Sequence, residues 1–369
     1  MQQKEATPEK KPSAICFVNT TRDWGGGEKW HFEMATMLQE KGYAVFTITA
    51  RGSALQKKLL EGKIPNATFN ISNISFLNPF TIKKLKAYFT RNSIDAVIMN
   101  LPSDLKTAGP AAKKAGVSKI IYRRGSAIPV KNSWLNRYLY RRIADLVLVN
   151  SRATKNTILE KNEKLIPHDK IKILYNGLHL ENYSYTKKSR QQSAPIVIGN
   201  LGRFVKQKGQ QRFIDIAGKL KEREIPFKII LGGEGKLKKE IQQKIRTKGL
   251  ESFFELPGFI ADTSRFMQQL DIFVLTSYWE GFGYVLAEAM ACGKPVIGFN
   301  ISSNPELIRD RQNGFLIEND DLDALTDRIE YLYRQPSEID RMAREGRKIA
   351  EQEFEIASVT NHLIHIIDQ

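Results

Sequence analysis

The sequence predicts an α/β protein with two doubly wound, Rossmann-like domains, and three observations lead to that expectation. The chain has 369 residues, which is too long for one ordinary domain and suits two domains of about 150–200 residues. Short apolar runs alternate with helical stretches along the chain, as in parallel sheets that are covered by helices. A polar stretch at 186–195 separates two such arrays and is interpreted as a linker.

The first array is expected over residues 13–192. It follows a lead-in at residues 1–12 that is polar, lacks the apolar region of a signal peptide and is expected to be disordered. The opening run at 14–18 is apolar like a buried parallel strand, and a glycine-rich turn then leads into a helix from about 28 to 41. Similar runs predict strands at 44–49, 95–99, 119–122, 146–149 and 172–174.

The second array is expected over residues 193–353. Its first strand is predicted at 196–199, and later strands at 227–231, 253–256, 272–275 and 295–298. Two helices are expected near the C-terminus, from 337 to about 352 and from 356 to 367. Because strands joined by helices form parallel crossover units, ligands are expected at the carboxyl ends of the strands.

The segment at 276–295 carries the clearest chemical signal. Glu280 and Glu288 stand eight residues apart on either side of a glycine-rich turn. The turn contains Gly281, Phe282 and Gly283. A buried strand precedes the turn and a helix follows it, so the N–H groups of the turn are available to bind an anion such as phosphate. Two carboxylates that accept hydrogen bonds from hydroxyl groups, beside a bound phosphate, suit a sugar nucleotide. The alternative is an ordinary strand–helix unit with two surface glutamates.

This segment resembles the glutamate–seven–glutamate motif of retaining GT-B glycosyltransferases, in particular glycosyltransferase family 4. The shared pattern is E-G-F-G followed by E-A-M-A-x-G-x-P-V-I, and the resemblance covers nearly the whole chain, most clearly 196–320. It implies two Rossmann-like domains that face each other across a cleft: an N-terminal acceptor domain at 13–192 and a C-terminal donor domain at 193–353. It also implies that the last helix, at 354–369, crosses back to the first domain.

The resemblance implies a role for each glutamate. Glu280 should hold hydroxyl groups of the transferred sugar, and Glu288 should hold the ribose hydroxyls of a UDP- or GDP-sugar. That donor is a substrate, and no separate cofactor and no metal are expected. The acidic pair Asp321 and Asp323 superficially matches a metal motif of another glycosyltransferase class, but its place before a helical run is typical of helix capping.

A basic loop after the first strand of the second array supplies another signal. It reads G-R-F-V-K-Q-K-G at 202–209 and resembles the G-R-x-x-x-x-K-G segment of the same family. In that family the arginine and lysine contact the donor diphosphate, which implies this role for Arg203 and Lys208. A guanidinium fork and an ammonium group would together neutralise the charge that grows on a departing diphosphate. Taken alone, the loop would more simply be a basic surface loop.

Three other glycine-rich turns are candidate contacts for the donor. Gly26 and Gly27 precede the first helix, where glycine lets the backbone approach a phosphate or sugar. The family has a loop here that closes on the donor. By the same resemblance Gly233 lies near the phosphates or the sugar, and the backbone of Ile260 contacts the base. Ordinary strand–helix turns remain the alternative for the last two positions.

The excess of positive over negative charge lies entirely in the first half of the chain. The formal net charge is +17, and residues 1–192 contain 33 Lys and Arg against 14 Asp and Glu. Residues 193–369 contain 24 against 26. This asymmetry predicts an anionic partner for the first domain. Nucleic acid, anionic lipid and a phosphorylated saccharide all qualify, and a solvated basic surface is the alternative.

The first array departs from the family at one position. Many members have a histidine after the fourth or fifth strand that touches the transferred sugar, whereas this chain reads Y-R-R-G-S-A at 122–127. Arg124 could take the place of that histidine beside the sugar. Alternatively, Arg123 and Arg124 are candidates for contact with an anionic acceptor. Nearby, Trp134 and Tyr138 alternate with arginines at helical spacing. That pattern is typical either of a helix at an anionic membrane surface or of a helix packed on the sheet.

These signals combine into one functional expectation. The chain should be a retaining, metal-independent glycosyltransferase that moves a sugar to an anionic, lipid-linked saccharide in cell-envelope glycan assembly, such as lipopolysaccharide. Its two cysteines form no disulfide framework, which fits a cytoplasmic protein at the inner face of the membrane. Two alternatives stay open: a basic nucleic-acid-binding protein, although the chain contains no recognised nucleic-acid motif, and a phosphorylase or epimerase of the GT-B fold.

Overall fold

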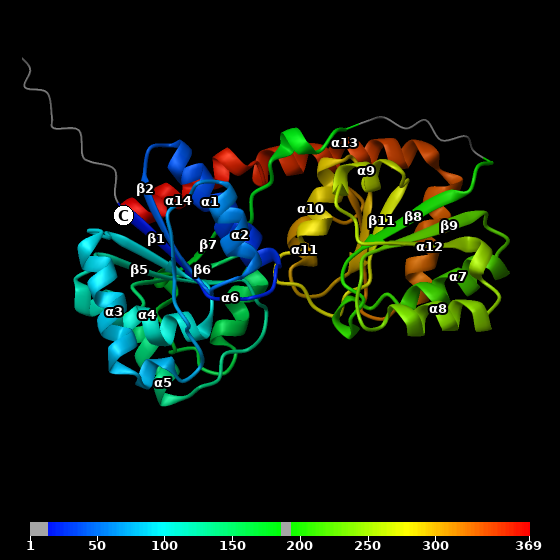
Figure 1. The fold of residues 1–369 in the computed structure, drawn as a ribbon. Helices are drawn as coiled ribbons and strands as arrows, with labels where there is room; N and C mark the ends of the chain where they lie inside the picture. The colour runs from blue at the N-terminus through cyan, green and yellow to red at the C-terminus, as the bar shows by residue number, and fades with distance from the viewer. Residues whose placement is uncertain (1–13, 186–192) are drawn as a thin grey trace, which may run out of the picture.

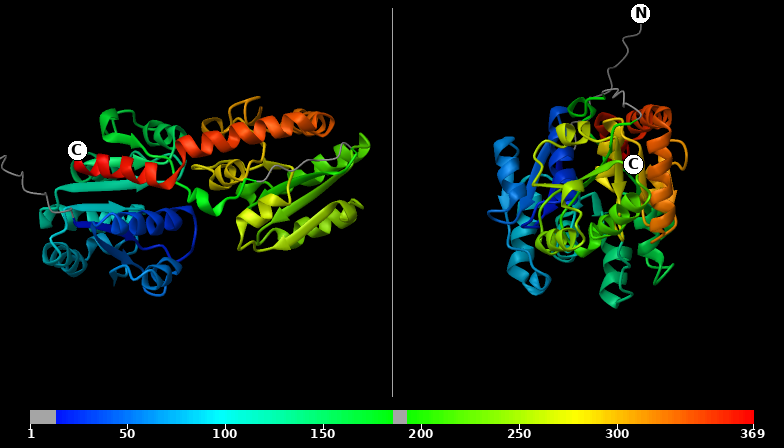
Figure 2. Two further views of the ribbon diagram at one scale, coloured as in Figure 1. Left: turned by 90° about the horizontal axis from the view of Figure 1, so that it is seen from above. Right: turned by 90° about the vertical axis from the view of Figure 1, so that its right-hand side faces the viewer.

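The computed structural model describes residues 14–185 and 193–369, and it consists of two α/β lobes (Figure 1). The expected lead-in at 1–12 and most of the expected linker at 186–195 lie outside the described residues. Each lobe contains one sheet whose paired strands all run parallel. Helices cover both faces of each sheet (Figure 2). The prediction of two doubly wound domains is confirmed.

The first sheet has the strand order β3-β2-β1-β4-β5-β6-β7. Its strands are β1 (Ala14–Asn19), β2 (Ala44–Thr49), β3 (Asn66–Thr68), β4 (Ala96–Met99), β5 (Lys119–Arg124), β6 (Leu146–Val149) and β7 (Ile171–Ile173). The helices between them are α1 (Gly26–Glu40), α2 (Ala54–Glu61), α3 (Pro79–Arg91), α4 (Pro102–Ala115), α5 (Trp134–Tyr138) and α6 (Arg152–Leu159). Successive residues of β1 belong to different apolar clusters, with Cys16 on one face and Phe17 on the other. The sheet is therefore buried on both sides, as its nearly continuous apolar strands require.

The second sheet has the strand order β10-β9-β8-β11-β12-β13. Its strands are β8 (Ile196–Leu201), β9 (Phe227–Gly232), β10 (Phe254–Gly258), β11 (Ile272–Leu275), β12 (Val296–Phe299) and β13 (Gly314–Ile317). Its helices are α7 (Arg212–Glu222), α8 (Lys238–Thr247), α9 (Thr263–Gln268), α10 (Tyr284–Ala291), α11 (Asn304–Leu307), α12 (Leu322–Arg334) and α13 (Pro336–Glu353). In both sheets the strand order reverses beside the first strand, between β1 and β4 and between β8 and β11. Such a reversal leaves a crevice at the carboxyl ends of the strands.

The last helix, α14 (Ile356–Asp368), packs on the first domain although α13 belongs to the second. Leu363 and Ile366 are buried in the same apolar cluster as Trp30 and Met34 of α1. Figure 2 shows α13 along one lobe and α14 along the other. The two C-terminal helices therefore join the domains, and Phe354 between them packs on Phe282 in the turn after β11.

The structure differs from the predicted elements in three places. The edge strands β3 and β13 were not predicted: β3 reads N-A-T and has no apolar run, and the short apolar run G-F-L-I of β13 was overlooked. The helix α1 begins at Gly26, two residues earlier than expected, so its first turn contains the glycines. The run at 132–143 forms α5 and then a π-helical turn, with Leu139 buried but Trp134 71% exposed. The apolar side chains of this run are thus divided between the core and the surface.

Candidate active site

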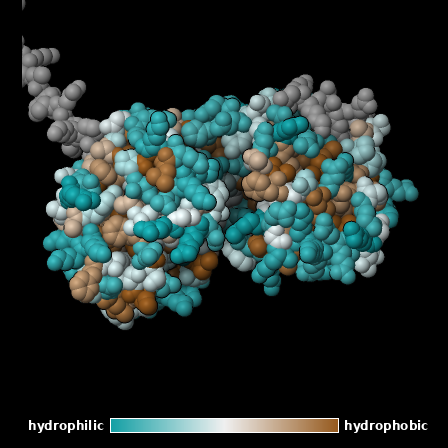
Figure 3. Space-filling view, in the orientation of Figure 1, coloured by the Kyte–Doolittle hydropathy of each residue, from teal (hydrophilic) through white to brown (hydrophobic). Residues whose placement is uncertain are grey.

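A cavity of about 820 Å³ lies between the two domains, where loops from both sheets meet. The first domain contributes Thr21, Gly26, Gly27, Asn100, Arg123 and Arg124, and the second contributes Arg203, Lys208, Glu280, Gly281, Phe282 and Gly283. Arg123 and Arg124 end β5, and the other residues follow β1, β4, β8 or β11, at or next to the two reversals of strand order. Figure 3 shows the narrowing between the two lobes. The cavity is therefore placed where doubly wound sheets bind ligands.

Glu280 lies in the loop after β11 and is 7% exposed. Its Oε1 atom accepts hydrogen bonds from Lys208 Nζ at 2.6 Å and from Ser277 Oγ at 2.6 Å. No residue in the described part of the chain donates to its Oε2 atom. Since the carboxylate lines the cavity, one oxygen is fixed by the protein while the other remains available to a hydroxyl group of a ligand.

Glu288 lies one turn into α10 and is 6% exposed. Its Oε1 atom accepts hydrogen bonds from Lys29 Nζ at 2.8 Å and from the Tyr183 hydroxyl at 3.0 Å. Burial alone would lower the pKa of Lys29, but the carboxylates of Glu288 and Glu33 hold it above its usual value. Glu288 is not among the residues that line the cavity, so the structure places the two glutamates in different surroundings.

The turn between β11 and α10 has the geometry of an anion-binding helix start. Gly283 adopts a left-handed conformation with φ of 83° immediately before α10, which glycine accommodates without strain. Within the described residues, no group accepts a hydrogen bond from the N–H groups of Gly281, Phe282 or Gly283. These donors stand at the positive end of a helix and beside the cavity, which is the arrangement that binds phosphate.

Arg203 and Lys208 approach the same cavity from the loop after β8. Arg203 is exposed, and its carbonyl oxygen accepts a hydrogen bond from Gln210 Nε2 at 3.1 Å. Its guanidinium makes no ion pair or hydrogen bond within the described residues. Lys208 ends a short 3-10 turn, and Gly209 follows it with φ of 64°. A Cβ atom on Gly209 would lie 2.2 Å from the carbonyl oxygen of Thr276. The glycine thus allows the basic loop to pack against the end of β11, which brings Lys208 to Glu280.

The other predicted donor glycines make close backbone approaches possible. A Cβ atom on Gly26 would lie 3.2 Å from the Tyr284 ring, and one on Gly27 would lie 2.8 Å from the Asn100 side chain. Gly233 has φ of 129°, and its Cβ would lie 2.0 Å from the Gly202 carbonyl oxygen. Gly233 and Ile260 do not line the central cavity; they lie on the neighbouring loops after β9 and β10.

Arg123 is 3% exposed and is held mainly by neutral groups. Its guanidinium donates to Asn100 Oδ1 at 3.1 Å and to Asn176 Oδ1 at 2.9 Å, and it lies 4.4 Å from the centre of the Trp30 ring. Burial lowers its pKa to about 10, and the nearby Glu28 carboxylate opposes that shift. Arg124 instead donates to the carbonyl oxygen of Ile128. Both arginines border the cavity, Arg123 as a buried cation at its base.

Several residues of this region were missed in the sequence. Glu28 lines the cavity and accepts hydrogen bonds from Asn19 at 3.1 Å and Asn100 at 3.3 Å. The sequence offered a signal for Glu28, which follows three glycines, and for Asn100, which directly follows β4. It offered no signal for Lys29, because its partner Glu288 is 259 positions away.

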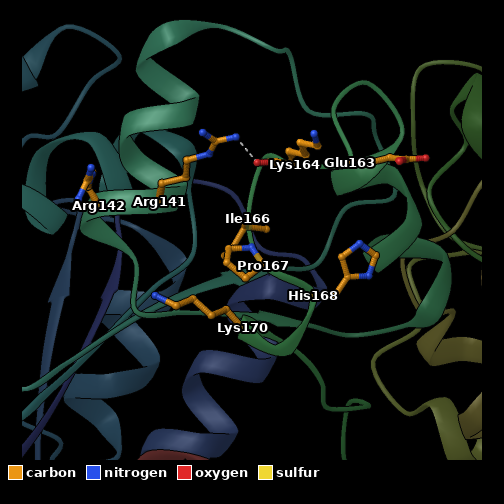
Figure 4. Close-up of a pocket in the computed structure, with 8 residues that line it drawn as sticks. All are labelled: Arg141, Arg142, Glu163, Lys164, Ile166, Pro167, His168 and Lys170. Carbon is orange, nitrogen blue, oxygen red and sulfur yellow. Dashed lines mark hydrogen bonds between the residues drawn. The ribbon is translucent and has the colours of Figure 1, made fainter.

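A second hollow of about 510 Å³ lies in the first domain, lined by residues that precede β6 and β7 (Figure 4). It contains Arg141, Arg142, Lys164, His168 and Lys170. The Arg141 guanidinium donates to the carbonyl oxygens of Lys164 and Leu165. Figure 4 shows the charged side chains spread around Ile166 and Pro167 rather than directed at one point. The hollow also contains one carboxylate, Glu163. Among the residues that the structure describes, it lacks the free N–H groups of a helix start that accompany the cations and carboxylates in the cavity between the domains.

Two family models match the chain. Residues 24–182 match Glycosyltransferase Family 4, and residues 184–349 match Glycosyl transferases group 1. The first match covers the lobe that contains α1 and Arg123, and the second covers the lobe that contains Arg203, Glu280 and Glu288.

Curated relatives of the chain include bacterial and archaeal glycosyltransferases. The putative glycosyltransferase EpsD of Bacillus subtilis is 34% identical over 39% of this chain and 38% of EpsD. The N-acetylgalactosamine-N,N'-diacetylbacillosaminyl-diphospho-undecaprenol 4-alpha-N-acetylgalactosaminyltransferase of Campylobacter jejuni is 30% identical over 56% of this chain and 55% of that enzyme. The lipopolysaccharide core biosynthesis glycosyltransferase LpsE of Rhizobium meliloti is 22% identical over 93% of this chain and 96% of LpsE. The matches thus span less than two thirds of EpsD and of the Campylobacter enzyme.

Solved structures share the whole architecture. HepE of Anabaena, solved in complex with UDP and glucose, superposes with a TM-score of 0.81 at 23% identity, covering 96% of this chain and 99% of HepE. A glycosyltransferase from Rickettsia africae superposes with a TM-score of 0.85 at 19% identity, covering 97% of this chain and 98% of that chain. At these identities the likeness establishes the fold.

Proposed function

The chain belongs to the GT-B glycosyltransferases, and from this premise we propose that it moves a sugar from a UDP- or GDP-sugar to an anionic, lipid-linked saccharide, with retention of the anomeric configuration. The family matches cover both lobes, whereas the donor, the acceptor and the stereochemistry belong to the proposal. The setting would be cell-envelope glycan assembly, in which LpsE is named as a lipopolysaccharide core enzyme.

One observation carries the proposal: a carboxylate, two cations and three free N–H groups meet at one cavity. Glu280 is fixed by Lys208 and Ser277 at 2.6 Å each. Arg203 and the turn at 281–283 border the same space. A nucleotide diphosphate sugar has the complementary parts. Its anionic diphosphate suits the cations and N–H groups, and the hydroxyl groups of its sugar can donate hydrogen bonds to the carboxylate.

In this proposal the cations and the turn stabilise the departing diphosphate. As the bond between the anomeric carbon and the phosphate oxygen breaks, negative charge grows on that oxygen. Arg203, Lys208 and the N–H groups of 281–283 would surround this oxygen. Their electrostatic stabilisation of the departing diphosphate would be stronger in a site that excludes water. Glu280 would orient the sugar through its free oxygen. Glu288, which is held by Lys29 and Tyr183, would accept hydrogen bonds from the ribose hydroxyls.

Retention follows if the acceptor attacks on the face from which the diphosphate leaves. The acceptor oxygen forms its bond to the anomeric carbon while the phosphate bond breaks, and the hydroxyl proton passes to the leaving phosphate oxygen. This step needs no protein nucleophile and no metal ion, since the positive charge comes from Arg203 and Lys208. Closure of the two domains would align the substrates and exclude water.

The first domain supports an anionic acceptor at a membrane. Arg123 and Arg124 border the cavity from that side, and the basic excess of the chain lies in residues 1–192. Large apolar side chains are also exposed there: Ile74, Leu77, Phe80 and Trp134 are 71–75% exposed. Cations beside exposed aromatic and aliphatic groups suit the surface of an anionic bilayer. No helix in the described ranges is long and apolar enough to span a bilayer, and we place the enzyme at the cytoplasmic face of the membrane as a peripheral protein.

The proposal is tested first with the donor. A thermal-shift panel of UDP-, GDP- and ADP-sugars should show stabilisation by a UDP- or GDP-sugar, and nuclear magnetic resonance of the product should show the donor's anomeric configuration. An inverted product would contradict retention. Full activity after treatment with a chelator is expected, and loss that added metal restores would contradict metal independence.

The membrane contact is tested separately by sedimentation with vesicles. Binding should increase with the fraction of anionic lipid and decrease with salt. Sedimentation that does not depend on anionic lipid would contradict this part of the proposal and leave the donor chemistry intact.

A further inference from the structure

A single carboxylate of the second domain is held by three donors of the first domain. Glu306, in α11, accepts hydrogen bonds from the Arg152 N–H at 2.7 Å and the Ala153 N–H at 3.0 Å. The Tyr175 hydroxyl donates to the same carboxylate at 3.1 Å. Arg152 and Ala153 begin α6, and Tyr175 lies just beyond β7. The contact therefore joins the two domains through charge-assisted hydrogen bonds.

The start of α6 is suited to receive this carboxylate. Ser151 caps the helix by accepting from the Thr154 N–H at 3.0 Å, so the N–H groups of the two preceding residues remain open to an outside partner. The positive end of the helix favours an anion there. Burial and the charge of Glu306 raise the pKa of Tyr175 to about 12, so its hydroxyl stays protonated and continues to donate at neutral pH.

The same helix end touches the turn that carries the proposed chemistry. Thr154 Oγ1 lies 3.4 Å from the carbonyl oxygen of Gly281, and it also donates to Asn150 Oδ1 at 2.9 Å. On the other side, Ser303 Oγ donates to the carbonyl oxygen of Glu280 at 3.4 Å. The segment at 303–306 thus contacts both α6 and the backbone of the 280–281 turn. A shift of Glu306 relative to α6 would move that turn relative to the first domain.

We propose that Glu306 is a positioning residue, which fastens the second domain to α6 and so sets the distance between Glu280 and the first domain's side of the cavity. Glu306 does not line the cavity and touches none of the groups assigned to the substrates. Its effect on transfer rests on the proposed function, whereas its effect on domain closure does not. Without the carboxylate, the equilibrium between closed and open domains should shift toward open.

The test compares Glu306→Ala with wild type by small-angle scattering, with and without UDP or GDP, and by sugar transfer. The variant should show a larger radius of gyration than wild type in the same buffer. Its kcat should fall by about 10–100-fold, since misplacement of about 1 Å far from the chemistry can cost that much. Glu338→Gln, which removes a surface ion pair with Arg341 on α13, is the control and should match wild type in both measurements.

Tyr175→Phe approaches the same contact from the first domain. It removes one donor and keeps the ring that packs near Phe282 and Phe354. Its effects should have the same direction as those of Glu306→Ala and be smaller. In the double variant they should not add, because the carboxylate that Tyr175 serves is already gone. If Glu306→Ala fails to fold, Tyr175→Phe by itself decides the matter: a scattering profile and kcat equal to those of wild type would overturn the inference.

Where Glu306→Ala folds, two results would overturn the inference. One is a Glu306→Ala protein with the scattering profile and kcat of wild type; the other is full additivity of the two substitutions. If wild type itself transfers no sugar, the proposed function fails, while the scattering comparison still decides whether Glu306 holds the domains together.

Discussion

Glu280 shows how one side chain can serve both the fold and a ligand. Lys208 and Ser277 hold the same oxygen, at 2.6 Å each, while the second oxygen has no donor among the described residues. The pair also joins the two loops that follow β8 and β11. A change at this residue therefore tests the sugar contact and the placement of Lys208 together.

Glu280→Gln should abolish most transfer and retain nucleotide binding. The amide keeps the size of the side chain but removes the charge that pairs with Lys208, so kcat should fall by about 10²–10³-fold, the usual cost of one electrostatic contact in a transition state. Calorimetry with UDP and GDP should give nearly unchanged affinity. Glu255→Gln, which removes a surface pair with Lys228, is the control. Transfer at the normal rate would show that Glu280 has another role.

A second residue-scale prediction concerns Glu33, which lies on α1 between the domains. Burial raises its pKa from 4.5 to about 7, although Lys29 acts in the opposite direction. The folded protein therefore binds a proton that the unfolded chain has lost, so stability falls as pH rises from about 4.5 through 7. Relative to Glu33→Gln, the unfolding free energy of wild type should fall by about 2 kcal/mol between pH 5 and pH 8.

Denaturant unfolding at the two pH values measures this difference. Glu40→Gln, at the exposed end of the same helix, should leave the pH dependence of wild type unchanged. A wild-type protein whose stability relative to Glu33→Gln is constant, or rises with pH, would show that the carboxyl is not protonated in the fold.

At the scale of elements, the turn between β11 and α10 depends on close packing against the first domain. A Cβ atom on Gly281 would lie 2.0 Å from the carbonyl oxygen of Gly125. Gly281→Ala should therefore push the two loops apart and lower kcat/KM by about 10–100-fold, with the melting temperature little changed. Gly218→Ala is the matched control, because nothing lies within 4 Å of its Cβ and it sits inside α7. That variant should be active and slightly more stable. Wild-type kinetics for Gly281→Ala would contradict this account of the turn.

The sequence predicted the elements whose apolar runs are buried on both faces. The strands β1, β2, β6, β8 and β11 were located within a few residues, because parallel strands inside a doubly wound sheet are nearly continuous in Val, Ile, Leu and Phe. The edge strand β3 is half-buried and polar, so its pairing with β2 is decided by the neighbouring strand rather than by its own residues. Its composition gave no signal.

The candidate site was predictable where its residues share one turn or loop. Glu280, Gly281 and Gly283 follow one another in the chain, and Arg203 and Lys208 lie on a single loop. By contrast, the pairing of Lys29 with Glu288 and that of Arg152 with Glu306 join residues more than 150 positions apart. Such contacts arise from the packing of the two domains and leave no periodic pattern in either partner's own segment.

At the scale of the whole molecule, the last helix fastens the C-terminus to the first domain. Leu363 is fully buried in the cluster that contains Trp30 and Met34. Leu363→Ala should cost about 2–5 kcal/mol of unfolding free energy, because it leaves a cavity in that cluster. His362→Ala, on the exposed face of the same helix, should cost little. Equal stability of the two variants in denaturant would show that α14 does not stabilise the first domain.

The central claim is that the cavity between the domains grips a nucleotide diphosphate with Arg203, Lys208 and the N–H groups of 281–283 while Glu280 faces the sugar. A crystal structure with UDP or GDP bound tests it most directly. We expect diphosphate density within hydrogen-bond distance of that turn and of Arg203 or Lys208. Diphosphate density at any other place, such as the basic hollow around Arg142 and Lys170, or no binding of either nucleotide at millimolar concentration, would contradict it.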